Sequence, residues 1–578
     1  MRLQTLAVAL ILISRVVLAQ TPAPTAAPPV PTAPRPQMQA PPRDNQPQSQ
    51  TGTAVIRGRI TAADTGRPLR RAHIVAAAPE LGRQNRDVST DIEGRYEIKD
   101  LPAARYTLTV TRSGYLRLRY GQRQSFEQGK PLEVAAGQVV QNIDFALPKM
   151  GTIAGRVTDE LGDPIEGASV FAMRLEYWNG RRQIVPVSQP FRTDDAGQYR
   201  VTGLMPGTYL VEAKIRETWT VTENGKTEQL GYAPTFLPGI TNVAEASKVT
   251  VGIGQQINVN DFPLVPGRAA KVSGVALDAH GRPLAAGNVS LSDETVGPGG
   301  GMFMGAGSSP IAADGTFAIP NVQPGEYKIR AQPNPQAAGT PEIVTQALVM
   351  DGRDVEGLQL ITTAGWSMKG KIVTETGEPP AVDRTRVNLT APLVFPDQEP
   401  RTVGMFTTTQ IRDDWTFTVT NLFGASRLQV STPIGWALKA VMQGGQDVSD
   451  APLDMKSGEE LSGLEVVLTN RVSHITGQIT DQKDAVADGT VIVFAADPAK
   501  WFDRSRWVRS ARPDQQGRYE VIGLPAGDYL AVALDFVQDG VWSDPEYLAP
   551  LVKQAQKVTL REDGQSVTVP LKLASAPQ

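Results

Sequence analysis

The chain has 578 residues, no cysteine and a formal net charge of −3 at pH 7. This length allows several domains, each with its own hydrophobic core. The absence of cysteine excludes disulfides, thiol nucleophiles and thiolate metal sites, and the small net charge gives no general reason to expect a nucleic-acid partner. The 54 glycines and 45 prolines suit many short strands that are joined by tight turns.

The first residues have the pattern of a secretory signal peptide. A short basic start is followed by the apolar run from Leu6 to Ile13 and by small or tolerated residues up to Ala19. We expect cleavage after Ala19, so that 1–19 is a signal peptide and the chain is exported to the periplasm, the outer surface or the extracellular space. The Pro-rich residues 20–50 are predicted to be a disordered linker, because they cannot bury enough apolar surface to fold. No later segment is long and apolar enough to suggest a membrane span after signal cleavage.

From residue 51 onward one pattern recurs five times. Each copy opens with an alternating strand that contains Gly, followed by a turn rich in Gly and Pro and by a second strand. An Asp-x-x-Gly-x-Tyr hairpin turn, a Pro-x-Gly-x-Tyr turn and a closing strand complete the copy. Apolar residues at every second position indicate half-buried strands, and about seven short strands in about a hundred residues are typical of a Greek-key β-sandwich. The sequence therefore predicts an all-β protein, a tandem array of about five Greek-key β-sandwich modules after a disordered Pro-rich segment.

The copies define the predicted module boundaries. Modules 1 to 5 are expected at 51–148, 149–265, 266–362, 363–469 and 470–574. Module 4 departs most from the pattern, because Trp415 stands in the place of the turn Gly and Arg427 in the place of the second-turn Tyr. We therefore expect module 4 to be degenerate.

The order of these motifs resembles the carboxypeptidase regulatory-like domain. The first copy runs from Asp91 to Tyr96 and then from Leu101 to Tyr106. That family is a transthyretin-like sandwich, grouped with Cna B-type and starch-binding-like modules in a carbohydrate-binding-like fold. The resemblance covers about residues 51–574. Its motifs are turn and core residues, so the resemblance implies a fold and says almost nothing about activity.

The sequence offers no visible catalytic site. Its only histidines, His73, His280 and His474, lie in different repeats and outside any zinc-peptidase or Ser-His-Asp motif. We predict no catalytic residues, no metal site and no cofactor.

The Asp residues of the hairpin turns are expected to cap their own turns through backbone N–H groups. One Asp per turn supplies too few oxygens for calcium. The turn carboxylates in question are Asp91, Asp195, Asp314 and Asp514.

Aromatic residues in predicted loops are the better functional lead. Trp and Tyr have flat apolar faces and a polar edge, which suits stacking on sugar rings or anchoring a protein partner. Alternatively, they cover the ends of their own cores or pack neighbouring modules together. The candidate ligand-contact residues are Tyr177, Trp178, Tyr232, Phe236, Trp501, Phe502, Trp507, Trp542 and Tyr547.

These observations predict an exported, non-catalytic binding or spacer protein of the cell envelope, with carbohydrate binding through the aromatic loops as the sharpest hypothesis. One alternative is a structural scaffold for protein–protein contacts at the envelope. Another is the accessory part of an outer-membrane receptor or transport system. The expected partner is a polysaccharide or an envelope protein, and not a nucleic acid.

Overall fold

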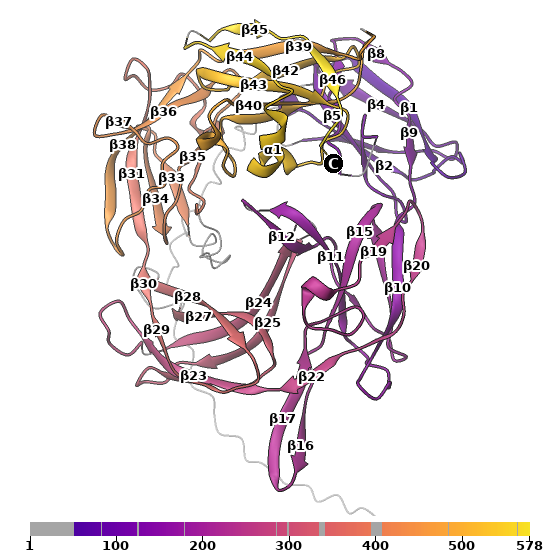
Figure 1. Ribbon diagram of the computed structural model, residues 1–578. Helices are drawn as coiled ribbons and strands as arrows, with labels where there is room; N and C mark the ends of the chain where they lie inside the picture. The colour runs from indigo at the N-terminus through magenta and orange to yellow at the C-terminus, as the bar shows by residue number, and fades with distance from the viewer. Residues whose placement is uncertain are drawn as a thin grey trace, which may run out of the picture. The chain divides into compact units, whose positions relative to one another are not determined.

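The computed structural model describes residues 51–577, except 82–83, 124–125, 179, 285, 298–299, 335–341, 395–406, 484 and 563. The predicted signal peptide at 1–19 and the predicted disordered linker at 20–50 lie outside the described residues. The described part consists mainly of β-strands (Figure 1). None of its helices is long and apolar enough to cross a membrane.

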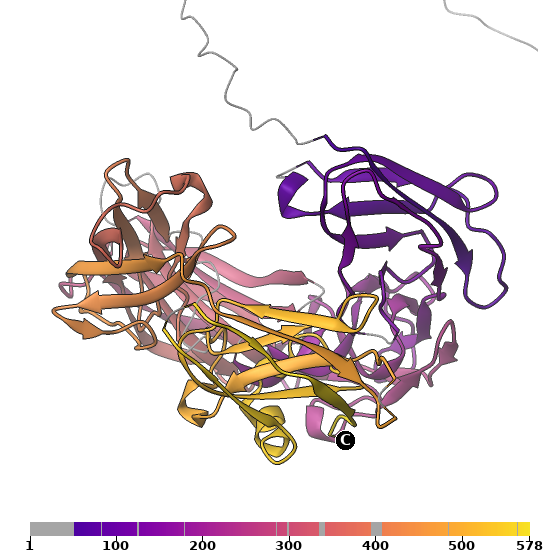
Figure 2. The same cartoon turned by 90° about the horizontal axis from the view of Figure 1, so that it is seen from above.

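Module 1 is a sandwich of two sheets around one core, and its strands form two layers in Figure 2, in indigo. One sheet has the order β4-β1-β8, with β9 also on β1, and the other has the order β3-β2-β5-β6, with β7 also on β5. The elements are β1 Ala54–Ala62, β2 His73–Ala77, η1 Pro79–Leu81, β3 Arg86–Ser89, β4 Arg95–Leu101, β5 Ala104–Thr111, β6 Leu118–Arg119, β7 Leu132–Val134, β8 Val139–Val140 and β9 Phe145–Leu147.

Module 2 repeats this plan and adds a third, three-stranded sheet, β16-β17-β22. The hairpin of β16 and β17 projects from the rest of the module (Figure 1). The elements are β10 Gly151–Thr158, β11 Ser169–Trp178, β12 Arg181–Pro186, β13 Phe191–Arg192, β14 Gln198–Leu204, β15 Gly207–Lys214, β16 Thr218–Glu223, β17 Lys226–Ala233, β18 Thr235–Phe236, η2 Val243–Glu245, β19 Val249–Val251, β20 Gln256–Asn258, β21 Phe262–Pro263 and β22 Val265–Arg268.

Module 3 has a three-stranded sheet, β26-β23-β29, and a five-stranded sheet, β25-β24-β27-β28-β30. A single core cluster contains buried residues from both sheets. The elements are β23 Ala270–Leu277, β24 Gly287–Gly297, β25 Gly300–Pro310, β26 Thr316–Val322, β27 Gly325–Pro333, β28 Glu342–Met350, β29 Val355–Ile361 and β30 Thr363–Ala364.

Module 4 folds around its own core despite its divergent turns. Its sheets have the orders β33-β34-β31-β38-β36-β37 and β32-β35. Trp415 adopts a left-handed φ of 65° at the place of the turn Gly, and its buried ring joins the core. The elements are β31 Trp366–Thr374, η3 Arg384–Arg386, β32 Asn388–Thr390, β33 Thr408–Ile411, β34 Thr416–Leu422, β35 Gln429–Ser431, β36 Ala437–Gln443, β37 Gln446–Asp447 and β38 Glu460–Thr469.

Module 5 is one eight-stranded sheet system, because β46 pairs with both β39 and β43. It has two core clusters, and the second lies under the α-helix α1. The elements are β39 His474–Thr480, β40 Thr490–Ala495, η6 Pro498–Lys500, β41 Val508–Ala511, β42 Arg518–Ile522, β43 Gly527–Leu534, η7 Val541–Ser543, α1 Pro545–Leu551, β44 Gln556–Leu560, β45 Ser566–Thr568 and β46 Leu571–Ala574.

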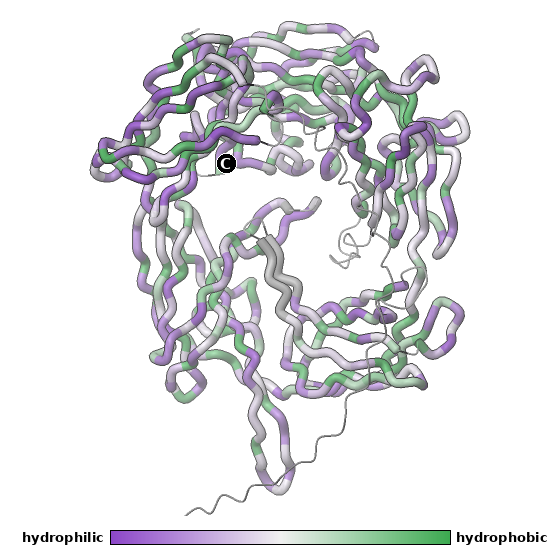
Figure 3. Tube along the Cα trace, turned by 180° about the vertical axis from the view of Figure 1, so that it is seen from behind, coloured by the Kyte–Doolittle hydropathy of each residue, from purple (hydrophilic) through white to green (hydrophobic). Residues whose placement is uncertain are grey.

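All modules share one strand pairing. The first strand pairs antiparallel with the strand that follows the hairpin turn and parallel with the closing strand, as β1 does with β4 and β9. Hydropathy alternates along many of these strands (Figure 3), as expected where one face is buried and the other is solvated. The predicted all-β array of sandwich modules is confirmed.

The glycine in the first strand of modules 1, 3, 4 and 5 lies against the backbone of the closing segment, whereas Gly155 of module 2 lies against the side chains of Tyr199 and Val259. A Cβ atom at Gly58 would stand 1.9 Å from the carbonyl oxygen of Ile143, and one at Gly477 would stand 2.0 Å from that of Val569. The hydroxyl of Tyr96 donates to the same Ile143 oxygen at 2.6 Å. This close approach of backbone explains why no side chain fits at Gly58 and Gly477.

The second-turn tyrosine closes its own turn in modules 1, 2, 3 and 5. In each case the hydroxyl donates to the backbone carbonyl oxygen four residues earlier. The pairs are Tyr106 with Pro102 at 2.7 Å, Tyr209 with Met205 at 2.5 Å, Tyr327 with Gln323 at 3.0 Å and Tyr529 with Pro525 at 2.7 Å.

The hairpin-turn aspartates cap backbone N–H groups, as predicted. The Oδ1 atom of Asp91 accepts from the amide of Arg95 at 2.7 Å, and Oδ1 of Asp514 accepts from the amide of Arg518 at 2.9 Å. In module 2 the prediction of Asp195 was one residue off. Asp194 makes this contact, because its Oδ1 atom accepts from the amide of Gln198, four residues on, at 2.8 Å.

Candidate functional site

Trp501 and Trp507, two of the candidate aromatic residues, are buried in module 5, with 7% and 8% of their surface exposed. The indole Nε1 of Trp501 donates to the carbonyl oxygen of Ala495 at 2.7 Å, and its ring meets the edge of Phe494 at 5.4 Å between centroids. Trp501 therefore closes the second core of module 5 and presents little open ring surface.

Trp507 and Phe502 contact module 4. The indole Nε1 of Trp507 donates to Oδ2 of Asp450 at 2.8 Å. The guanidinium of Arg427 lies 3.8 Å from the centroid of the Phe502 ring. Both aromatic residues therefore connect the fourth and fifth modules.

Trp542 and Tyr547 lie on helical turns, not in the loop that the sequence suggested. The Oδ1 atom of Asp544 accepts from the amide of Glu546 at 2.9 Å and so caps the start of α1, where Pro545 takes an early position. Asp-Pro-Glu is a helix-start signal that the sequence analysis did not use. Both rings are half-buried against the second core of module 5, and burial raises the pKa of Tyr547 to about 12.

The four candidates of module 2 also lie on strands rather than loops. Tyr177 and Trp178 end β11, which continues as a long hairpin with β12. Tyr177 is half-buried, which raises its pKa to about 12, whereas the Trp178 side chain lies outside the described part. Tyr232 in β17 and Phe236 in β18 are buried, and the Tyr232 ring packs 4.7 Å from that of Trp219.

The sequence analysis missed a buried charge cluster between modules 1 and 5. We call it the module 1–5 contact, and it comprises Arg123, Glu127, Asp488 and Arg512. The side chains of Arg512 and Glu127 are 1% and 0% exposed, and a guanidinium nitrogen of Arg512 donates to the Glu127 carboxylate. Arg123 donates to Oε1 of Glu127 at 2.8 Å, and Arg512 donates to Oδ1 of Asp488 at 3.0 Å.

The protonation of Glu127 follows from these contacts. Burial raises the pKa of Glu127, but the hydrogen bond from Arg123 and the charge of Arg512 outweigh burial. The pKa of Glu127 therefore lies below its ordinary value, and the carboxylate is ionised at neutral pH.

Hydrogen bonds around the cluster extend the module 1–5 contact. The side-chain amide of Gln128 donates to Oγ of Ser510 at 3.1 Å and to Oδ1 of Asp539 at 2.9 Å. The backbone amide of Asp539 donates to the carbonyl oxygen of Phe126 at 2.6 Å. The contact is therefore formed by backbone as well as by side chains.

Other module pairs are also joined by ion pairs. Arg182 of module 2 pairs with the buried Asp544 of module 5 at 2.8 Å. The Nζ atom of Lys214 in module 2 lies 2.7 Å from Oδ2 of Asp293 in module 3 and 3.2 Å from the buried Glu212. Burial raises the pKa of Glu212.

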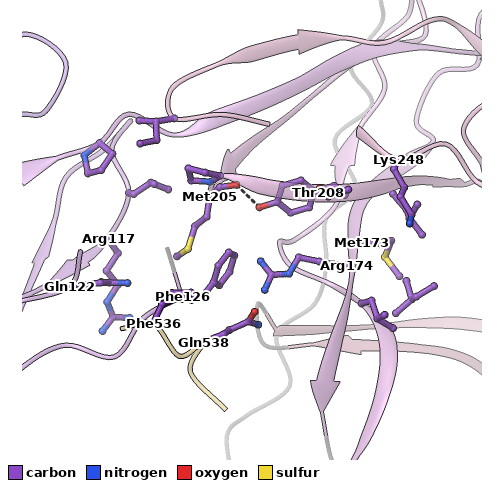
Figure 4. Close-up of a pocket in the computed structure, with 18 of the residues that line it drawn as sticks. Arg117, Gln122, Phe126, Met173, Arg174, Met205, Thr208, Lys248, Phe536 and Gln538 are labelled. Atoms are coloured by element: carbon purple, nitrogen blue, oxygen red, sulfur yellow. Dashed lines mark hydrogen bonds between the residues drawn. The ribbon is translucent and has the colours of Figure 1, made fainter. Parts of the chain in front are cut away.

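A cavity of about 980 Å³ lies beside the module 1–5 contact (Figure 4). Modules 1, 2 and 5 all contribute to its wall, through residues such as Phe126, Met205 and Phe536. The guanidinium of Arg174 lies 3.7 Å from the centroid of the Phe126 ring, so modules 1 and 2 touch in this wall. No single repeat contains the cavity, and therefore no repeat motif could reveal it.

The histidines do not share a site, and two of the three are hydrogen-bonded to a carboxylate of their own module. His73 lies 2.9 Å from Asp87 in module 1, and His474 lies 2.9 Å from Glu520 in module 5. Within the described ranges, no group of three or more acidic or histidine side chains could hold a metal ion.

Two segments of the chain, residues 55–148 and 152–264, match the family model of the carboxypeptidase regulatory-like domain. The resemblance seen in the sequence is thereby confirmed for modules 1 and 2.

The chain is also similar to solved bacterial pilins, at low sequence identity. The minor pilin GBS52 of Streptococcus agalactiae is 11% identical, with 37% of this chain and 97% of that chain covered and a TM-score of 0.21. The major pilin subunit BcpA of Bacillus cereus is 12% identical, with 73% of this chain and 99% of that chain covered and a TM-score of 0.16. At these TM-scores the pilins carry no argument about function. No curated protein matches the chain.

Proposed function

We propose that this chain is an exported, non-catalytic structural protein of the cell envelope whose modules are held in a fixed arrangement by charged contacts. The module 1–5 contact carries the proposal. It joins Arg512 to Glu127, which are 385 residues apart in the sequence and both almost fully buried.

A buried ion pair favours a defined arrangement over a flexible one. Removing two charges from water costs free energy, which is recovered only when both charges are paired with good geometry. A chain that acted as a flexible spacer would have no need to bury Arg512, Glu127 and their hydrogen-bond partners. The contact therefore supports a structural role in which module 1 stays docked on module 5.

The non-catalytic part of the proposal is supported by the family match of modules 1 and 2, whose shared motifs are turn and core residues. Export and envelope location rest on the predicted signal peptide at 1–19. Protein scaffolding at the envelope is the form of structural role that we favour over the accessory part of a receptor or transport system.

Carbohydrate binding through the aromatic candidates is the less supported function. Trp501 and Trp507 are buried in the core of module 5, and Phe502 is covered by Arg427. Retention of the unchanged chain on insoluble polysaccharide or peptidoglycan, with release by soluble glycan, would favour carbohydrate binding over scaffolding.

Fractionation and lysine cross-linking of producing cells test the proposed function. We expect the chain in the envelope or secreted fraction, and we expect cross-linked peptides that join module 1 to module 5 within one chain. Arg512→Glu should remove these peptides, whereas Arg561→Glu, a charge reversal at an exposed residue of the same module, should keep them. A cytosolic location, or the absence of peptides that join the two modules in the unchanged chain, would contradict the proposal.

A further inference from the structure

The cavity between modules 1, 2 and 5 has the size and wall of a small-molecule site. Its volume of about 980 Å³ lies at the upper end of the usual range for ligand pockets, and such pockets are mostly apolar. The larger apolar side chains of the wall include those of Leu116, Phe126, Met173, Met205, Ile253 and Phe536.

The charged residues of the wall all have the same sign. They are Arg117, Arg123, Arg174 and Lys248, and no Asp or Glu is among the described residues that line the cavity. Two of these cations already have carboxylate partners. Arg123 pairs with Glu127 at 2.8 Å, and Arg174 pairs with Glu176 at 3.1 Å.

Arg117 and Lys248 are the two cations that remain for a ligand. Among the described residues, no carboxylate lies within ion-pair distance of either one. Figure 4 shows them at opposite sides of the cavity, with the stacked Phe126 and Arg174 between them. Within the described part of the chain, the cavity therefore has an unpaired cation at each side, and between them an apolar ring stacked on the paired Arg174.

We propose that this cavity binds an amphipathic carboxylate, a hydrocarbon chain that carries one carboxylate group. The chain would bury apolar surface against Phe126, Met173 and Met205, which is the main favourable term for such a ligand. The carboxylate would form a charge-assisted hydrogen bond with Arg117 or Lys248. A cationic ligand of the same length would find no carboxylate among the described residues of the wall.

This inference goes beyond the structural role, because it assigns a small ligand to the place where three modules meet. A ligand that binds only the docked arrangement stabilises that arrangement, and above the dissociation constant the stabilisation grows with the logarithm of the ligand concentration. Occupation of the cavity would therefore hold modules 1, 2 and 5 together more firmly.

Calorimetric titration of the mature chain with dodecanoate tests the proposal, with dodecyltrimethylammonium as the probe of opposite charge. Both probes are used below the concentrations at which they form micelles. We expect dodecanoate to bind with one site per chain and dodecyltrimethylammonium to bind at least about tenfold more weakly. Equal affinity for the two probes, or no binding of dodecanoate, would overturn the proposal.

Two pairs of variants locate the binding. Arg117→Gln with Lys248→Gln should weaken dodecanoate binding about tenfold, because it removes both free cations. Arg70→Gln with Lys226→Gln removes two exposed cations that do not line the cavity and should leave binding unchanged. Equal weakening by both pairs would place the ligand elsewhere and overturn the proposal.

A filling variant provides a test that does not depend on charge. Ala244 is exposed on the turn η2 and lines the cavity, so Ala244→Trp should weaken binding of dodecanoate without affecting the folded core. Unchanged dodecanoate affinity in this variant would also overturn the proposal. If cross-linking joins module 1 to module 5 and dodecanoate does not bind, only the ligand proposal fails.

Discussion

Module 5 closes its second turn with Tyr529, whose hydroxyl donates to the carbonyl oxygen of Pro525 at 2.7 Å. Module 4 has Arg427 at the matching position, and there the indole of Trp366, from the first strand, donates to the carbonyl oxygen of Gly424 at 3.1 Å. The turn is closed in both modules, but by donors from different parts of the chain.

The exchange leaves Arg427 available for the neighbouring module. Its guanidinium stacks on Phe502 of module 5, and its Nε donates to the carbonyl oxygen of Asp450 at 2.9 Å. Burial lowers the pKa of Arg427, and the charges of Asp450 and Asp503 oppose this effect. In module 4 the departure from the repeat pattern therefore marks a contact between modules and not a defective fold. Contacts between modules and contacts within one module should then respond differently to substitution.

Arg512→Ala should have the largest effect, because it leaves the buried Glu127 without one of its two cationic partners. We expect the free energy of the unfolding step that separates modules 1 and 5 to fall by about 3 kcal/mol. Urea unfolding monitored by fluorescence or circular dichroism would measure this loss. Arg561→Ala removes an exposed arginine from the same module and should cause a much smaller loss. Equal losses in the two variants would contradict a special role for the buried pair.

Trp366→Phe should have the next largest effect and should act on module 4 alone. The ring is almost fully buried, and its Nε1 makes the hydrogen bond to Gly424. We expect a loss of about 2 kcal/mol, from the smaller ring and the unpaired carbonyl oxygen together. Hydrogen exchange measured by mass spectrometry should show faster exchange in module 4, and faster exchange in module 1 would contradict the assignment.

Tyr529→Phe sharpens the comparison, since it removes only the hydroxyl that closes the turn in module 5. We expect a loss of about 1 kcal/mol in stability, because the carbonyl oxygen of Pro525 loses its partner while the ring stays in place. Arg427→Tyr in module 4 should bring no compensating gain, because Trp366 already donates to that turn. A clear stabilisation by Arg427→Tyr would show that the two turns are equivalent after all.

A change of pH around neutrality should have the smallest effect on the docking of modules 1 and 5. The pKa of Glu127 is lowered in the folded protein, so its contribution to stability is complete above the pKa of an unfolded Glu and is lost as the pH falls through the folded pKa. Docking of module 1 on module 5 should therefore be constant around pH 7 and should fail only in acid. Glu127→Gln should remove this acid dependence. If undocking of the variant in acid is unchanged, groups other than Glu127 cause the acid dependence.

The sequence predicted the strands and turns because their causes are local. Alternating apolar residues, the first-strand Gly58 and the turn Tyr106 each act within one module, where the strands and turns lie as the repeat pattern predicted. The helix α1 was missed although its capping residue Asp544 was visible, because the aromatic residues around it suggested an open loop.

The module 1–5 contact and the cavity could not be predicted in this way. Arg512 and Glu127 look like ordinary surface charges in the sequence, and only the partner module buries them. The cavity wall likewise combines short stretches of three modules. Contacts between modules depend on how whole sandwiches dock, and the repeat motifs contain no information about this docking.

The central claim is that module 1 is docked on module 5 through the buried pair of Arg512 and Glu127. Since the chain has no cysteine, Ile92→Cys and Val552→Cys, at residues 71% and 41% exposed, give unique sites for spin labels in modules 1 and 5. Electron–electron double resonance should give one narrow distance distribution for the otherwise unchanged chain and a broad one after Arg512→Glu. A broad distribution in both, or a narrow one that survives Arg512→Glu, would contradict the claim.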